Sequence, residues 1–173
     1  PRSVPLEANL SESTPAASTV GSEDEAEEEQ PAGTPSLSEA DAKTRIDEDL
    51  KEFFSIRDLT EAEVYFTKLP SEHRHLLVDK LVTRAVESKQ ADAQLVADLF
   101  ERAISRNLCS PASFEEGFTP TAEIIDDIAI DAPKAMDLFA IMIKGSHLHM
   151  DEERRTRLAS KSMDSDKLVA LLS

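Results

Sequence analysis

From position 39 to the end of the chain, apolar residues recur every three or four positions, with polar residues between them. This period is typical of amphipathic α-helices, in which one face packs against the rest of a domain. The first stretch of this kind places Ile46, Leu50, Phe53 and Phe54 on one side. Because the pattern gives almost no strand signal, it predicts an all-α fold.

Residues that begin and end helices divide this part of the chain into six or seven helices. Side chains that can accept from the free N–H groups of a first turn precede several apolar stretches. These expected caps are Ser38, Asp58, Ser71, Ser110 and Asp164. Pro70 should end the second helix, and Pro120 should kink or interrupt the fifth. Gly145 should supply a left-handed cap at the end of the sixth.

Helices of this length, joined by short connections, are typical of stacked antiparallel hairpins. The helix pairs recur about every 40 residues, which is compatible with a HEAT-like solenoid. We therefore expect HEAT-like stacked antiparallel helical hairpins, although no exact sequence repeat is present.

Residues 1–38 differ in composition from the rest of the chain. They contain no aromatic residue, five prolines and an acidic run at positions 23–29. Such a segment cannot bury enough apolar surface to offset the entropy of ordering it. We expect 1–38 to be a disordered acidic linker. Residues 39–173 hold all seven phenylalanines and the single tyrosine, and we expect them to fold as one domain.

The charge balance limits the classes of partner. The formal net charge is −16, and acidic residues outnumber basic ones both in 1–38 and in 39–173. Direct binding of nucleic acid needs a basic stripe, which is absent, so proteins with basic faces are the expected partners. A lone Cys109 rules out an internal disulfide and fits a reducing compartment, here the cytoplasm. No apolar run has membrane-spanning length, so no membrane association is expected.

Chemistry-bearing residues do not form a recognisable catalytic or metal-binding pattern. His73 and His75 would point in different directions on a helix, and His147 with His149 lacks a third ligand. There is no Gly-rich phosphate loop, and nothing places serine, histidine and acidic residues as a triad. We expect no metal, no cofactor and no enzymatic activity.

The most informative stretch is 123–135, where one helix should end and the next begin. Asp131, followed by Ala-Pro133, is a helix start signal. Asp127 lies four residues earlier on the same face, and the end of a helix disfavours its negative charge. A solvated acidic face, a partner-binding spot and a catalytic carboxylate pair all remain compatible with these two residues.

Several motifs in this order resemble the MA-three domain, a HEAT-like helical domain. It occurs in the C-terminal part of translation initiation factor 4G and, in tandem, in the programmed-cell-death tumour suppressor that inhibits translation. The matching stretches are Lys51–Ala62, Phe114 with Gly117 and Phe118, and Asp127-Ile-Ala-Ile-Asp131-Ala-Pro133-Lys-Ala135. The resemblance covers about residues 40–150. Pro120 departs from it, and the residues after 150 match poorly.

The resemblance implies a module that binds the DEAD-box RNA helicase of initiation, factor 4A. By this resemblance, Asp127 and Asp131 would contact basic residues of the helicase, while Pro133 and Ala135 would shape the contact loop. A single copy of the domain favours the scaffold factor, which supports the helicase, over the tandem inhibitor. We expect a monomer. Three alternatives stay open: an inhibitor of the same fold that blocks the helicase, a helical hydrolase using the carboxylates, and a dimerisation module.

Overall fold

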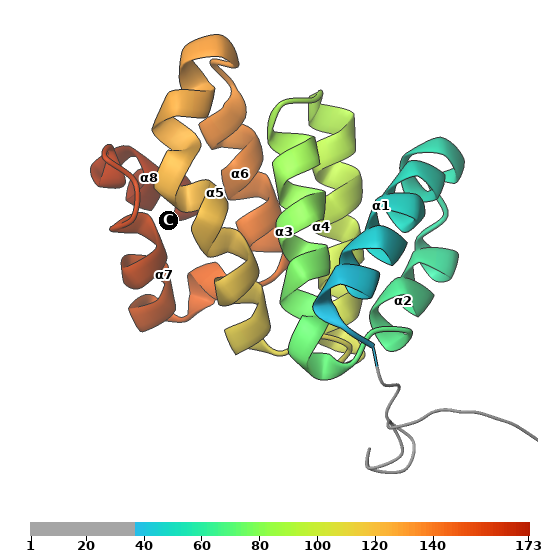
Figure 1. Ribbon diagram of the computed structural model, residues 1–173. Coiled ribbons are helices and arrows are strands. Elements are labelled where there is room, and N and C mark those ends of the chain that lie inside the picture. The colour runs from blue at the N-terminus through green and yellow to red at the C-terminus, as the bar shows by residue number, and fades with distance from the viewer. Residues whose placement is uncertain (1–36) are drawn as a thin grey trace, which may run out of the picture. The chain divides into compact units, whose positions relative to one another are not determined.

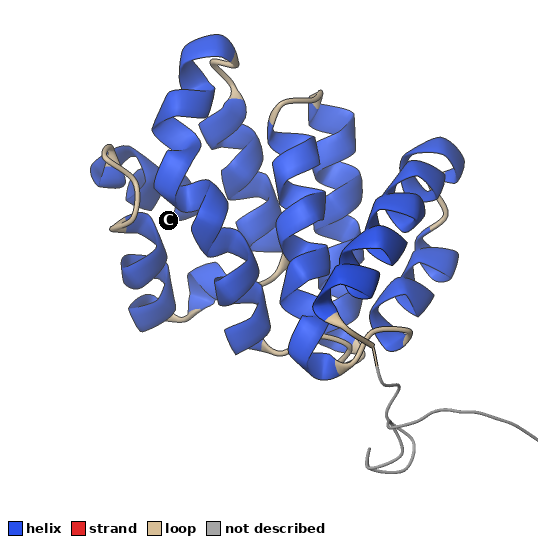
Figure 2. Ribbon diagram, in the orientation of Figure 1, coloured by secondary structure: helices blue, strands red, loops and turns tan. Residues whose placement is uncertain are grey.

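The computed structural model describes residues 37–173, and these form eight α-helices and two short 3-10 helices (Figure 1). The described part of the chain contains no strand (Figure 2). The elements are α1 (Glu39–Ile56), α2 (Leu59–Thr67), η2 (Ser71–His73), α3 (Arg74–Val86), α4 (Gln90–Ser105), α5 (Pro111–Asp131), α6 (Ala135–Gly145), η3 (Leu148–Met150), α7 (Glu152–Ala159) and α8 (Ser165–Leu172).

The helices stack in two layers. In one layer α3 packs between α1 and α5, and α5 also contacts α7; in the other, α4 packs between α2 and α6, and α6 contacts α8 (Figure 1). Each odd-numbered helix is followed by its even-numbered partner after a short connection. This arrangement confirms the all-α fold of stacked, HEAT-like hairpins. The helix count exceeds the expected one because residues 152–159 also form a helix.

Four of the five predicted helix starts are confirmed by cap hydrogen bonds. Ser38 Oγ accepts from the N–H of Asp41 at 3.1 Å, and Asp58 Oδ1 accepts from the N–H of Thr60 at 2.9 Å. The side chains of Ser110 and Asp164 cap α5 and α8 in the same way. Ser71 does not cap a helix: it lies in η2, where no side-chain cap bond forms, and α3 begins only at Arg74.

Pro120 does not interrupt α5, which runs without a break from Pro111 to Asp131. A proline inside a helix removes the N–H that would bond to the carbonyl four residues earlier, here that of Glu116. Glu116 and Pro120 are both exposed, so the position of the lost hydrogen bond is on the solvent-facing side of α5. The predicted interruption is absent.

Gly145 ends α6 without a left-handed conformation; the left-handed residue is His147, with φ 66°. The glycine is needed for a different reason. A Cβ at position 145 would lie 2.5 Å from the carbonyl oxygen of Ala97 in α4. Gly145 thus lets α6 approach the backbone of α4, and its predicted role as a left-handed cap is wrong.

An aromatic cluster forms the centre of the core. Phe100, Phe114, Phe118 and Phe139 are all fully buried, and the ring centroid of Phe118 lies 5.7 Å from that of Phe100 and 5.8 Å from that of Phe139. Edge-to-face pairs of this kind add to the burial of apolar area. The cluster joins α4, α5 and α6, and so fixes α5 firmly in the domain.

The folded unit begins at Leu37, two residues before the expected boundary. Leu37 packs against the core, and its carbonyl oxygen accepts a hydrogen bond of 2.8 Å from His73 Nε2. The predicted disorder of residues 1–36 falls outside the described residues. Within residues 37–173, no helix has both the length and the apolar character required to cross a membrane.

Candidate partner-binding site

Asp127 and Asp131 occupy the last two turns of α5, and both are exposed. Among residues 37–173, neither carboxylate forms an ion pair or accepts a side-chain hydrogen bond. Both lie at the end of the helix that carries partial negative charge, and the last turn contains no basic residue. Their charges are thus uncompensated within the described domain.

Asp131 does not cap α6, contrary to the prediction. It is the last residue of α5, and the N–H of Ala132 after it donates to the carbonyl of Ile128 at 2.9 Å. The residue that precedes α6 is Lys134, which makes no side-chain cap bond. A capping side chain must stand directly before the first helical residue, and Asp131 lies four residues before Ala135.

Pro133 and Ala135 differ in their environment. Pro133 is exposed in the turn between α5 and α6, whereas Ala135 is fully buried, and its N–H donates to the carbonyl of Ala132 at 2.8 Å. Ala135 can therefore shape the turn but has no surface to offer a partner. Next to the turn lies an open hollow of about 380 Å³, lined by Val86, Ser88, Ala132, Pro133, Lys134, Ala135 and Leu138.

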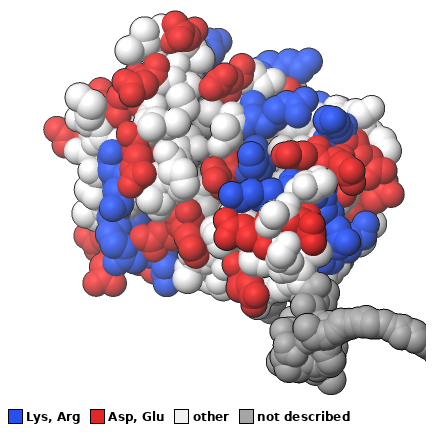
Figure 3. Space-filling model, viewed as in Figure 1, with Lys and Arg blue, Asp and Glu red and all other residues white. Residues whose placement is uncertain are grey.

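The solvent-facing side of α5 combines acidic and apolar residues. Glu123, Asp127 and Asp131 follow each other at intervals of four, so they form one acidic stripe along the helix. Exposed isoleucines flank it: Ile124 is 48% exposed and Ile130 is 77% exposed. Figure 3 shows acidic side chains beside uncharged surface at the end of the molecule where α5 meets α6.

Glu115 has a structural role that the sequence did not reveal. Arg154 Nη1 donates to the Glu115 carboxylate at 2.7 Å, and Arg157 Nε donates to it at 2.7 Å. The hydrogen bond from Arg157, with that from Arg154, holds the pKa of Glu115 below its ordinary value. These ion pairs join α7 to α5. The only available signal was the spacing of the two arginines, which places them on one helix face.

Asp126 is the second anchor of the C-terminal helices. This half-buried carboxylate accepts from the N–H of Met163 at 2.8 Å, from the N–H of Asp164 at 3.2 Å and from the hydroxyl of Ser162 at 3.0 Å. Its partners lie more than 35 residues away along the chain. No local signal distinguishes Asp126 from its neighbour Asp127, although one holds the fold together and the other faces solvent.

Two further charge clusters stabilise the layers. Arg102 and Arg106, at the end of α4, form ion pairs with Glu63 in α2 at 2.7 and 3.2 Å. Asp92, which is 8% exposed, accepts from Arg57 at 2.8 Å and also from the hydroxyl of Ser88. Burial works to raise the pKa of Asp92, but these hydrogen bonds outweigh it and the pKa is lowered.

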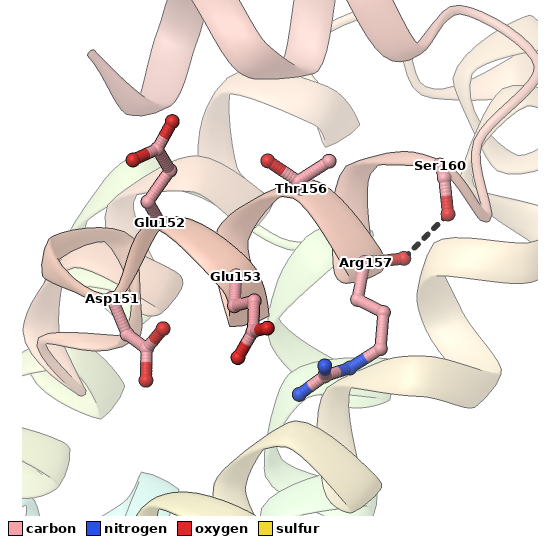
Figure 4. A pocket seen from close by; sticks show the side chains of 6 residues that line it. All are labelled: Asp151, Glu152, Glu153, Thr156, Arg157 and Ser160. Atoms are coloured by element: carbon pink, nitrogen blue, oxygen red, sulfur yellow. Dashed lines mark hydrogen bonds between the residues drawn. The ribbon is translucent and has the colours of Figure 1, made fainter.

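A hollow of about 640 Å³ lies on α7 and is lined by Asp151, Glu152, Glu153, Thr156, Arg157 and Ser160 (Figure 4). Several of its polar groups are used by the fold. Asp151 caps α7, Arg157 binds Glu115, and the Ser160 hydroxyl donates to the carbonyl of Arg157 at 2.7 Å. Figure 4 shows the Glu152 carboxylate pointing away from those of Asp151 and Glu153.

Within residues 37–173, no group of three or more histidine, cysteine, aspartate or glutamate side chains could hold a metal ion. His75 Nε2 lies 3.6 Å from Oε2 of Glu116. His149 is half-buried, and burial lowers the pKa of its imidazole. Cys109 is buried, and burial raises the pKa of its thiol to about 12. A thiol with this pKa is a poor nucleophile near neutral pH.

Comparison with known proteins identifies the family. The profile of the MA3 domain matches residues 42–145, which include α2 to α6 and the acidic pair. The chain is 33% identical over 100 residues to MA3 domain-containing translation regulatory factor 1 of Arabidopsis thaliana, a match that covers 57% of this chain and 14% of the relative. It is 30% identical over 105 residues to MA3 domain-containing translation regulatory factor 2 of the same plant. This match covers 60% of this chain and 15% of the relative. The chain therefore spans only about one-seventh of these relatives, and it belongs to the MA3 domain family.

Proposed function

We propose that this domain is a non-catalytic module of translation control in the cytoplasm, which binds a DEAD-box RNA helicase of the initiation factor 4A type. The observation that carries the proposal is the exposed acidic pair Asp127 and Asp131 at the end of α5, for which residues 37–173 provide no ion-pair partner. Unpaired carboxylates at the negative end of a helix gain stability when a cationic group approaches them. The names of the matched relatives support a role in translation.

The two carboxylates would receive lysine or arginine side chains of the helicase. Pro133 would contact the partner from the adjoining turn, and Ala135 would hold that turn in place from the core. The net charge of −16 would speed the approach of a basic surface and disfavour direct contact with nucleic acid. Binding would be weakened by salt, since exposed charges separated by more than about 10 Å are screened at 0.1 M.

Two outcomes for the helicase are distinguishable. A scaffold of the factor 4G type would favour the productive arrangement of the helicase lobes and raise its ATPase rate. An inhibitor would bind the same face and lower the rate. The matched relatives are named translation regulatory factors, which keeps the inhibitor as the second candidate.

A binding titration with the purified helicase tests the proposal. Replacing Asp127 and Asp131 by lysine should abolish binding, because it turns attraction into repulsion. Glu48 and Glu52 provide a matched control, since they are exposed, four residues apart and on the remote helix α1. The Glu48→Lys, Glu52→Lys variant should bind like wild type. Equal binding by both double variants would refute the acidic-pair mechanism. The ATPase rate of the helicase bound to wild type then distinguishes the two candidates, because a scaffold raises this rate and an inhibitor lowers it.

A further inference from the structure

The connection between α7 and α8 is held against α5 by a single carboxylate. Asp126 accepts hydrogen bonds from three consecutive residues of this connection, Ser162, Met163 and Asp164. Ser162 is 5% exposed, so the inner side of the connection is buried. The backbone at Met163 is therefore fixed, and its side chain must point outward.

Met163 is 90% exposed, and Ile130 on α5 is 77% exposed; no other large apolar side chain in residues 37–173 is as exposed as either. Ile130 follows Asp126 by four positions, so it lies on the same side of α5, about 6 Å further along the helix axis. Scattered exposed apolar residues are common, but here Ile130 lies about one turn from the carboxylate that binds the Met163 backbone, next to an acidic stripe.

We propose that Ile130 and Met163 form an apolar contact spot in the same surface as Asp127 and Asp131, occupied by the helicase partner of the proposed function. The helices after the family-matched region 42–145 would then take part in binding, through a connection that Asp126 holds in position. The inference rests on the proposed function and adds to it a binding element contributed by residues beyond the matched segment.

The arrangement fits a partner with an apolar side chain surrounded by basic ones. Interfaces commonly have a central spot enriched in methionine and other large apolar residues, with charged groups around it. Glu123, Asp127 and Asp131 supply the acidic border on one side of Ile130. A second copy of this chain is a poorer occupant, because a symmetric contact would bring the acidic stripes of both copies together.

Polar replacements of similar size test the apolar spot. Ile130→Gln and Met163→Gln should each raise the Kd for the helicase about fivefold, and the double variant by more than tenfold. The melting temperature should not change, since both side chains are exposed. Met150→Gln is the matched control, because Met150 is 74% exposed and lies in η3, outside the connection that Asp126 holds; it should leave the Kd unchanged.

Asp126→Asn tests the positioning role of Asp126. It should raise the Kd in the wild-type background but add little to Met163→Gln, because Asp126 acts on binding only through the connection that carries Met163. Additive effects of the two changes would overturn this role.

The outcomes separate this inference from the proposed function. If the lysine variants of Asp127 and Asp131 lose binding while Ile130→Gln with Met163→Gln binds like wild type, the apolar spot is refuted and the acidic-pair mechanism stands. If wild type does not bind the helicase, both are refuted. If sedimentation shows a wild-type dimer that Met163→Gln converts to monomer, the occupant is a second copy and the inference is wrong.

Discussion

A Cβ placed on Gly117 in α5 would lie 2.5 Å from the Cβ of Val78 in α3 and 2.8 Å from the carbonyl oxygen of His75. Real Cβ atoms do not approach other atoms this closely, so only glycine permits the observed contact between these helices. The α3–α5 contact is the most extensive helix–helix contact among the described residues. The position of α5, and of the acidic pair at its end, therefore depends on the absence of a side chain at Gly117.

Gly117→Ala should lower the free energy of unfolding by about 1 to 3 kcal/mol, because the added methyl group forces α3 and α5 apart. Chemical denaturation of the whole chain measures this change. Val78→Ala in the same molecule should recover at most a small part of the loss, because alanine removes the Cγ1 at 2.6 Å but keeps the Cβ at 2.5 Å and leaves the His75 carbonyl oxygen at 2.8 Å. A Gly117→Ala protein as stable as wild type would show that α3 can move away without loss.

Phe118→Ala should destabilise the domain by about 3 to 5 kcal/mol, because it opens a cavity where four phenylalanines meet. Phe54→Ala should have a smaller effect, since Phe54 is only half-buried and packs beneath the guanidinium of Arg84 at 5.0 Å. Parallel thermal melts compare the two variants. Equal losses would contradict the different burial of the two rings.

Asp131→Ala should leave the domain as stable as wild type, or more stable by about 0.3 to 1 kcal/mol, because it removes a negative charge from the C-terminal end of α5. Asp127→Ala, one turn earlier, should have a smaller effect in the same direction. Denaturation at low ionic strength is the suitable measurement. A loss of about 1 kcal/mol for Asp131→Ala would instead point to a helix cap.

The cluster of Glu115 with Arg154 and Arg157 makes part of the stability depend on pH. The pKa of Glu115 is lower in the folded protein than its ordinary value of 4.5, so the folded state favours the ionised carboxylate. This contribution is present above pH 4.5 and is lost as the pH falls through the lower folded value. Wild type should therefore be more stable than Glu115→Gln at neutral pH, and the difference should shrink as the pH falls below 4.5. A difference independent of pH would mean that the ionised form is not favoured.

Local signals predicted much of the fold. Ser38, Asp58 and Ser110 cap helices through bonds to residues two or three positions later, so their roles are visible in a few letters of sequence. The start of α6 was misplaced because Asp131 and Pro133 together imitate a helix start. The chain instead makes a turn through Pro133 and Lys134, and the helix begins at Ala135.

The roles of Glu115 and Asp126 could not be predicted, because both depend on residues 36 to 42 positions away. In the sequence these carboxylates look like Glu116 and Asp127 beside them. Only the packing of α7 and of its connection to α8 against α5 separates the structural acids from the exposed ones. The same limit applies to Gly145, because glycine is required there only by the close backbone of Ala97 in α4.

The crowding around α5 restricts where its sequence can vary. One side of the helix faces the aromatic cluster, and the half-buried Asp126 holds the connection, which leaves an exposed strip beside Asp126 that includes Glu123, Asp127 and Ile130. Substitutions in this strip change the exposed surface and leave the fold intact. Substitutions a quarter-turn away change the packing of the fold and leave the exposed surface intact. Related chains can therefore acquire different partner preferences along this strip without having to rebuild the domain that carries it.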